Sequence, residues 1–360
     1  MQQQSLIEPP SELNRLHETL DMELPNINGA RMDALRFRSR FEAAVFGLTS
    51  EDTSIVVFGS LARDEFTDGS DVDWTLLIDG VADPKHLDLA RQVKGTLESM
   101  DAKDPGQEGV FGNLAYSHDI VHQIGGEDDS NSNTTRRILL ILESRAIGRR
   151  DSFNRVLNHV LSRYISEDPR FLQRDAQFQI PRFLLNDFAR YWRTMAVDFA
   201  HKRRTRGGTG MAIRNIKLRM SRKLIFVSGL LGCFSVHLQL ADAEKAALLT
   251  ADNPSQEFVR HLRRVFAQTP LEILAAVVNR YHHLGPIGKK LFGAYDKFLG
   301  TLRDPSGRAR LNSIAPGAAE ADPLFQELRA YSHEFRDALL ELFFDEKTGL
   351  DRLTRTDGVF

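Results

Sequence analysis

Two aspartates one residue apart, Asp71 and Asp73, have the spacing that places two carboxylates on one face of a strand. Side chains alternate across a strand, so residues at i and i+2 project from the same side. The apolar stretch Trp74–Ile78 follows the pair and is expected to hold it rigidly. Two like charges need a counter-ion, and Mg²⁺ binds carboxylate oxygens while keeping positions open for phosphate oxygens. The pair therefore predicts a divalent metal site.

A glycine–serine pair, Gly59-Ser60, precedes the aspartates by a spacer of ten residues. Ser54–Phe58 is short, apolar and rich in β-branched residues, which predicts a buried strand that ends at this pair. Leu61–Glu65 predicts a brief helix. The glycine lets a ligand approach the backbone, and the amides at the helix start can hold an anion together with the Ser60 hydroxyl. The turn therefore fits a phosphate, and Arg63 in the brief helix is a further candidate nucleotide-binding residue.

The strand, the Gly59-Ser60 turn, the spacer and the Asp71-Val72-Asp73 pattern resemble the nucleotidyltransferase superfamily with the fold of DNA polymerase β. The resemblance implies a small mixed sheet with helices, and transfer of a nucleoside monophosphate from a nucleoside triphosphate. It also implies two Mg²⁺ ions, with Mn²⁺ as an alternative, bound by Asp71 and Asp73, and a triphosphate held at Gly59 and Ser60. The alternative interpretation is a surface Asp-x-Asp beside a turn.

The same resemblance implies a third acid on a neighbouring strand, and Asp119 is the best candidate. It lies in 114–124, a segment of strand-like composition that ends at two glycines. Asp119 would complete the metal cage and act as general base on the attacking hydroxyl. Asp128 and Asp129 are the alternatives, but their loop position favours helix capping or a solvated role. Asp119 could also be a polar residue at an exposed strand edge.

The chain divides into two parts by pattern. Residues 1–150 carry the motif and the strand signals, and are expected to form an α+β nucleotidyltransferase domain with a small mixed sheet. Residues 151–360 show mainly helical periodicity, which predicts an all-helical domain that could bind the acceptor. Helices are expected at 84–100, 180–200 and 211–231.

The end of the first part weakly resembles the transferase domain of bacterial uridylyltransferases that modify the nitrogen-signalling PII protein. The likeness is carried by the stretch from the Gly125-Gly126 pair to Arg145. The chain departs from these enzymes by having Gly-Ser in place of Gly-Gly and by lacking His-Asp hydrolase and ligand-sensing domains. The resemblance implies a protein acceptor as one possibility.

A run of basic residues without any acid lies between residues 202 and 223: Lys202, Arg203, Arg204, Arg206, Arg214, Lys217, Arg219, Arg222 and Lys223. Cations on a helix that faces the site would bind a triphosphate, pyrophosphate or an RNA acceptor. The alternative interpretation is that this basic helix face is solvated or paired with acids of another helix. Lys217 is the best candidate for a phosphate contact because it stands between two apolar residues that would anchor its turn.

Composition limits the classes that remain. The formal net charge of -2 argues against a generic nucleic-acid binder. The single cysteine, Cys233, excludes an internal disulfide and a multi-cysteine zinc site. Apolar runs are too short for a membrane span, and the N-terminus does not resemble a signal peptide. A soluble, cytoplasmic protein is therefore expected, and the oligomeric state is open.

The sequence thus predicts a metal-dependent nucleotidyltransferase that moves a nucleoside monophosphate from a nucleoside triphosphate to a hydroxyl, with release of pyrophosphate. The acceptor would be an RNA 3′ end or a protein residue. A second nucleotide, which would give a cyclic or linear second messenger, and a small-molecule hydroxyl are alternatives. A rival of another class is a non-catalytic regulator that binds nucleotide without turnover.

Overall fold

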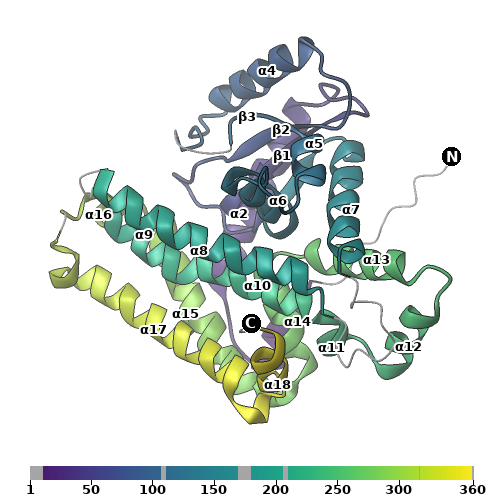
Figure 1. The fold of residues 1–360 in the computed structure, drawn as a ribbon. Helices are drawn as coiled ribbons and strands as arrows, with labels where there is room; N and C mark the ends of the chain where they lie inside the picture. Colours follow the sequence, from purple (N-terminus) through teal and green to yellow (C-terminus); the bar gives the residue numbers. More distant parts are fainter. Residues whose placement is uncertain (1–10, 107–110, 169–179, 206–209, 316, 359–360) are drawn as a thin grey trace.

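A computed structural model shows how the elements are arranged (Figure 1). It describes residues 11–106, 111–168, 180–205, 210–315 and 317–358. A small sheet with its covering helices lies at one end of the molecule, and long helices fill the other end. In the described part of the chain, none of the helices combines the length and the apolar composition of a bilayer span.

Four strands form one mixed sheet in the order β3-β2-β1-β4. They are β1 (Thr53–Phe58), β2 (Trp74–Ile78), β3 (Asn113–Tyr116) and β4 (Ser144–Ile147). β1 is antiparallel to β2 and to β4, whereas β2 is parallel to β3. The strands predicted before the Gly-Ser pair and after the aspartates are β1 and β2, so both predictions are confirmed.

Helices surround this sheet and follow it in the chain. Those of the first 150 residues are α1 (Glu12–Leu20), α2 (Pro25–Ala44), α3 (Gly59–Ala62), α4 (Lys85–Ser99), α5 (Ser117–His122) and α6 (Asn131–Leu142). From residue 151 the elements are α7 (Asp151–Ser166), α8 (Arg182–Thr205), α9 (Met211–Lys217), η1 (Leu218–Arg222), α10 (Lys223–Cys233), α11 (Ser235–Gln239), α12 (Asp242–Thr250), α13 (Pro254–Phe266), α14 (Pro270–Arg280), η2 (His282–Leu284), α15 (Gly285–Arg303), α16 (Pro305–Ser313), η3 (Ala319–Ala321), α17 (Pro323–Phe344), η4 (Glu346–Thr348), α18 (Asp351–Leu353) and η5 (Thr354–Gly358).

The central strand β1 is buried on both faces because its side chains alternate between two cores. Ile55 and Val57 enter a core shared with α2, α4 and Leu76. Val56 and Phe58 enter the other core, which continues through α6 and α7 into the C-terminal helices. This period of two follows from the pleat, and the β-branched residues suit it. The sheet is therefore fixed from both sides.

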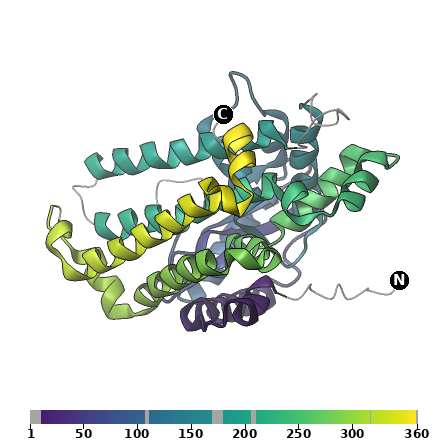
Figure 2. The ribbon, with the colours of Figure 1, turned by 90° about the horizontal axis from the view of Figure 1, so that it is seen from below.

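Acids of the C-terminal helices cap the first two helices of the chain. Asp296 of α15 accepts hydrogen bonds from the amides of Asn26 and Ile27, each at 2.9 Å, at the start of α2. Glu272 of α14 accepts one at 3.1 Å from the amide of Leu13 in α1. Negative charge at a helix N-terminus is stabilising. The N-terminal helices therefore pack beside the helical layer, as Figure 2 shows (purple beside green), and join it to the sheet.

The predicted fold class, a small mixed sheet followed by a helical region, is confirmed. The helix expected at 84–100 is α4, and that at 180–200 is α8, which extends to Thr205. The helix expected at 211–231 is continuous but contains a π-helical turn, η1, between α9 and α10. Such turns are rare and occur often at functional sites. The division at residue 150 stays a prediction.

Candidate nucleotide-transfer site

Three adjacent strands bring the candidate residues to one end of the sheet. The amide of Phe58, the last residue of β1, donates to the carbonyl oxygen of Asp73 at 2.9 Å, directly before β2. On the other side, Phe58 pairs with Ser144, the first residue of β4. Gly59 therefore follows β1 at the sheet end where Asp73 precedes β2 and Glu143 precedes β4. Sheet register alone places these three residues together.

Gly59 is required at this turn for two reasons. Its φ is +65°, in the left-handed region that side chains strain. A Cβ atom built on it would lie 2.9 Å from Oδ2 of Asp73. The next residue, half-buried Ser60, is in the short helix α3, which begins at Gly59 instead of at the predicted Leu61. The turn therefore brings backbone directly against the Asp73 carboxylate.

Asp71 and Asp73 lie on the extended approach to β2 rather than within the strand. Val72 between them is 1% exposed and belongs to a core, while Asp71 is exposed and Asp73 half-buried. The amide of Val72 donates to the carbonyl oxygen of Lys103 at 3.0 Å, which fixes this approach. The two carboxylates therefore face away from the core on the same side, as their spacing dictates.

The Asp73 carboxyl has its pKa raised to about 6, chiefly because burial disfavours the charged form. The positive charge of Arg222 opposes this shift, and the negative charges of Glu143 and Asp71 add to it. No lysine or arginine of the described chain forms an ion pair with Asp73. Its charged form therefore lacks a direct counter-ion.

Glu143 is the third carboxylate at this end of the sheet, and sequence reasoning missed it. It follows α6 directly and is only 3% exposed. Its carboxylate forms ion pairs with Arg63 and, at 3.4 Å, with Arg222. In sequence it only ends an apolar helix, and the pairing of β4 with β1 is what places it beside Gly59. A carboxylate directly before a strand was the only available signal.

The prediction that Asp119 lies on a strand is wrong. β3 ends at Tyr116, and Asp119 is in the first turn of α5. Because β3 runs parallel to β2 and Tyr116 pairs with Ile78, α5 begins at the end of the sheet opposite Asp73. Five residues of β2 separate the two ends by roughly 15 Å. The Asp119 side chain is 47% exposed and contacts His118. Asp119 is therefore too far from Asp71 and Asp73 to share a metal ion with them.

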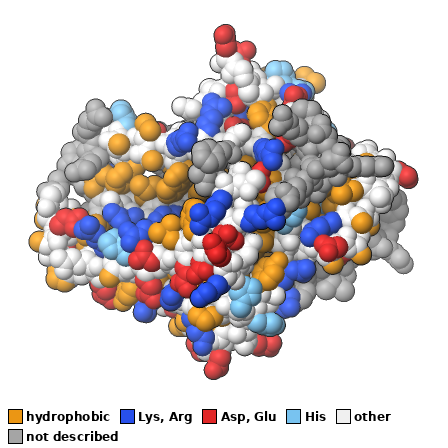
Figure 3. Space-filling model, turned by 60° about the horizontal axis from the view of Figure 1, so that its bottom comes forward, with side chains coloured by type: hydrophobic (Ala, Val, Ile, Leu, Met, Phe, Trp, Pro, Cys, Tyr) orange, Lys and Arg blue, Asp and Glu red, His pale blue; other side chains and the backbone are white. Residues whose placement is uncertain are grey.

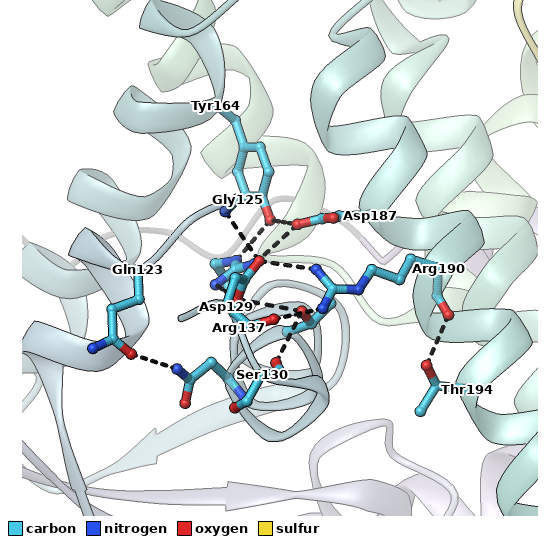
Figure 4. A network of polar contacts seen from close by, with 11 residues as sticks. Gln123, Gly125, Asp129, Ser130, Arg137, Tyr164, Asp187, Arg190 and Thr194 are labelled. Atoms are coloured by element: carbon cyan, nitrogen blue, oxygen red, sulfur yellow. Dashed lines mark hydrogen bonds and ion pairs between the residues drawn. The ribbon is translucent and has the colours of Figure 1, made fainter. Parts of the chain in front are cut away.

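The alternative acid Asp129 is neither solvated nor a helix cap, contrary to expectation; the cap of α6 is Ser130. Asp129 is buried and accepts from Arg137 at 2.9 Å and from Arg190 at 2.9 Å. Figure 4 shows these side chains converging with those of Tyr164 and Asp187. Asp128, by contrast, is exposed. Asp129 therefore belongs to a buried ion-pair network that joins α6, α7 and α8.

Arg63, which is predicted to bind nucleotide, lies between two carboxylates, and its nucleotide-binding role stays a prediction. Its Nη2 is 2.9 Å from the Glu65 carboxylate, and its Nη1 contacts Glu143. The side chain is almost completely buried, and its pKa is raised by these two acids even though burial acts in the opposite direction. Arg63 therefore links Glu65 to Glu143 through its guanidinium.

Lys217 of α9 faces the carboxylate pair from the helical side. Burial, together with repulsion from Arg308 and Arg222, lowers the pKa of its ammonium to about 8, and attraction to Asp71 opposes this. Arg308 of α16 is likewise attracted to Asp71. Three cations from the C-terminal helices, Lys217, Arg222 and Arg308, therefore surround the end of the sheet that carries three carboxylates.

The other residues of the basic run do not form one continuous basic surface among the described residues. The side chains of Lys202, Arg203, Arg204 and Arg206 lie outside the described residues. Arg219 and Lys223 belong to a cluster with Arg329 and Arg336 of α17, and mutual repulsion contributes to the lowered pKa values of Arg219 and Lys223. Acids intervene, since Arg329 pairs with Glu320 and Arg336 with Asp337. Figure 3 shows Lys and Arg side chains lying among Asp and Glu side chains on one face.

No group of three or more His, Cys, Asp or Glu side chains among the residues that the structure describes is arranged to hold a metal ion. Glu143 forms ion pairs with two arginines, so Asp71 and Asp73 are the two carboxylates at this end of the sheet that could bind a metal ion. A cavity of about 590 Å³ lies between α8, α10 and the start of α6, and Arg190, Phe226 and Asp357 are among its lining residues. None of the sequence-predicted site residues lines it.

Comparison with protein families identifies one match: residues 39–104 match the family described as the nucleotidyltransferase domain. The matched segment includes Gly59, Ser60, Asp71 and Asp73, and excludes Glu143 and the C-terminal helices. No curated protein and no solved structure matches the chain. The match supports the superfamily predicted from the motif, and with it nucleotide transfer in general. The likeness to PII uridylyltransferases stays a prediction.

Proposed function

We propose that this nucleotidyltransferase-domain protein moves a nucleoside monophosphate from a nucleoside triphosphate to a hydroxyl of an RNA 3′ end or of a protein, with release of pyrophosphate. One observation carries the proposal. The Gly59 turn and the carboxylates of Asp71, Asp73 and Glu143 lie at one end of the sheet, opposite basic side chains of the helical layer. Carboxylates next to cations can hold metal and polyphosphate together.

The donor set fits a divalent cation. Asp73 has a raised pKa and no paired cation in the described chain, and exposed Asp71 stands beside it. Oxygen donors of this kind suit Mg²⁺, or Mn²⁺, and we propose that Asp71 and Asp73 hold two such ions. When bound, the ions would neutralise charge on the phosphates and polarise the phosphoryl group.

The chain's own residues bind and orient the two substrates. Ser60, in the turn after β1, would donate its hydroxyl to the triphosphate, and Gly59 leaves room for the approach. Lys217 and Arg222 would bind the β- and γ-phosphates as cations. We assign the third acid to Glu143 in place of Asp119, because it stands at the site. It would accept the proton of the attacking hydroxyl once the triphosphate draws Arg222 away from it.

The test is a transfer assay with the full chain. The purified protein is incubated with each of the four labelled nucleoside triphosphates and Mg²⁺, with and without total tRNA. Label in RNA or in protein would support the proposed acceptors, and label in a new nucleotide or small molecule would identify the alternative acceptors. Label that binds without transfer would establish a non-catalytic regulator and overturn the proposal. The Asp71→Asn/Asp73→Asn double variant serves as the inactive control.

A further inference from the structure

The spacer between the Gly59-Ser60 turn and Asp71, residues 61–70, sets the distance between the phosphate-binding turn and the carboxylates. It contains no strand, and only its first residues are helical. Yet Glu65, Thr67 and Ser70 are 3%, 2% and 8% exposed. An irregular segment that is this buried must be held by specific partners, because its polar groups have lost water.

Tyr295 of α15 holds the middle of the spacer. Its hydroxyl donates to Oε1 of Glu65 at 2.9 Å, and the tyrosine is fully buried. Oε2 of Glu65 accepts from Arg63 at 2.9 Å, and Arg63 in turn contacts Glu143. A helix 230 residues away in sequence is thereby connected to the third carboxylate of the site.

Arg308 of α16 holds the end of the spacer next to Asp71. Its guanidinium donates to Oγ1 of Thr67 at 2.6 Å, to the carbonyl oxygen of Gly69 at 2.7 Å and to Oγ of Ser70 at 3.4 Å. A planar fork with five donors is suited to several acceptors at once. Nζ of Lys103 also donates to the carbonyl oxygen of Gly69, at 3.1 Å, but Arg308 is the side chain that contacts three residues of the turn leading into Asp71.

The two partners come from helices that meet at one corner of the helical layer. Asp304, between α15 and α16, caps α16 by accepting from the amides of Ser306 at 3.1 Å and Gly307 at 2.9 Å. α15 is itself anchored through the capping contact of Asp296 with α2. Tyr295 and Arg308 therefore stand on two consecutive helices joined at a capped corner.

We infer that Tyr295 and Arg308 are positioning residues: through the spacer they fix Asp71 relative to Ser60, so that the C-terminal helices complete the transfer site. The expected effect on catalysis rests on the proposed function. The hydrogen bonds that Tyr295 and Arg308 donate to the spacer are present in the free protein. Small displacements of a reacting group are sufficient to slow transfer strongly.

The first experiment measures amide hydrogen exchange in the free full-length protein. In Arg308→Ala, the Ser70 amide, which donates to the carbonyl oxygen of Thr67, should exchange about tenfold faster or more because the turn loses its support. Arg310→Ala is the matched control, since Arg310 is two residues away on the same helix and pairs with Asp322. Exchange that is equal in both variants and in the wild type would overturn the inference.

The second experiment measures transfer. Arg308→Ala should lower kcat about tenfold to a hundredfold with little change in KM for the nucleotide, and added guanidinium should restore part of the rate. Tyr295→Phe should lower kcat as well, whereas Tyr331→Phe, which removes a hydroxyl bound to Glu327 near the surface, should not. A loss confined to KM would show a direct phosphate contact and overturn the positioning role. A wild type without transfer would overturn the proposed function. The exchange experiment would still show whether Arg308 stabilises the spacer.

Discussion

The Glu143 carboxylate lies 3.4 Å from the guanidinium of Arg222, an ion pair that joins the start of β4 to the π-helical turn η1. Glu143 also contacts Arg63, so one buried acid is held by a cation from each part of the molecule. Removing one member of a buried ion cluster leaves uncompensated charge, which costs more than the pair contributes.

Glu143→Gln should therefore lower the free energy of unfolding by about 3 kcal/mol and abolish transfer. Asp119→Asn should change stability by less than about 0.5 kcal/mol and leave transfer intact, because that side chain is 47% exposed at the other end of the sheet. Urea unfolding and the transfer assay measure both. Loss of transfer in Asp119→Asn with retention in Glu143→Gln would reverse the assignment of the third acid.

Asp73→Asn should make the metal-free protein more stable at pH 7.5 while abolishing transfer. The folded-state pKa of about 6 lies above the reference value of 3.8, so the folded protein binds the proton more tightly than the unfolded chain. Stability is therefore lost as the pH rises from about 4 to above 6, by up to about 3 kcal/mol, and the variant avoids this loss.

Urea unfolding at pH 7.5 and at pH 4 tests this expectation, with exposed Asp68→Asn as the control. The gain of Asp73→Asn should be largest at pH 7.5 and disappear near pH 4. Mg²⁺ should stabilise the wild type and not the variant, because a bound cation stabilises only the folded state that holds it. A variant less stable than the wild type at pH 7.5 would contradict the raised pKa.

Gly59→Ala should lower both stability and transfer more than Gly47→Ala. Both glycines have positive φ, +65° and +78°, so each substitution strains the backbone by about 1–2 kcal/mol. Only at Gly59 would the added Cβ meet the Asp73 carboxylate, whereas nothing lies within 4 Å at Gly47. Thermal unfolding and turnover of the two variants separate backbone strain from close approach. Equal effects would show that contact with Asp73 is unimportant.

Lys217 should make nucleotide binding pH-dependent. Its pKa of about 8 means that the ammonium is charged below pH 8 and loses its proton above it, so affinity for a triphosphate should fall as the pH rises through 8. Lys217→Arg should remove this dependence, because arginine keeps its charge. Lys217→Met should weaken binding at pH 7 and approach the wild type at pH 9, where the lysine has lost most of its charge, and Lys223→Met serves as the control. Calorimetric titration at pH 7 and pH 9 measures the difference.

Arg137→Met should destabilise the fold by about 3–5 kcal/mol, because it leaves the buried Asp129 and Asp187 without their shared cation. Arg190→Met should cost less, since Arg190 is partly exposed and pairs with Asp129 alone among these acids. Both variants should transfer nucleotide normally at temperatures where they are folded. Selective loss of transfer in folded Arg137→Met would return Asp129 to the candidates for the third acid.

Features that depend on local backbone geometry could be predicted from the amino-acid sequence. The strand before Gly59, the glycine turn and the i, i+2 spacing of Asp71 and Asp73 depend on residues within 25 positions of one another. The i, i+2 spacing in extended backbone directs both carboxylates to one side, although the two aspartates precede β2 and are not part of it. The motif could therefore be recognised, and with it the superfamily, before any long-range contact was known.

The other residues of the site are brought there by strand pairing and helix packing. The strand-like composition around Asp119 favours it as the third acid, but β3 ends early and its parallel register directs α5 to the far end of the sheet. The local signal of Glu143 is only its position directly before a strand, and the pairing of β4 with β1 brings it to the site. Arg308 arrives through packing of helices more than 230 positions away from the spacer. Strand pairing and helix packing depend on the whole chain, so a short window of sequence does not encode them.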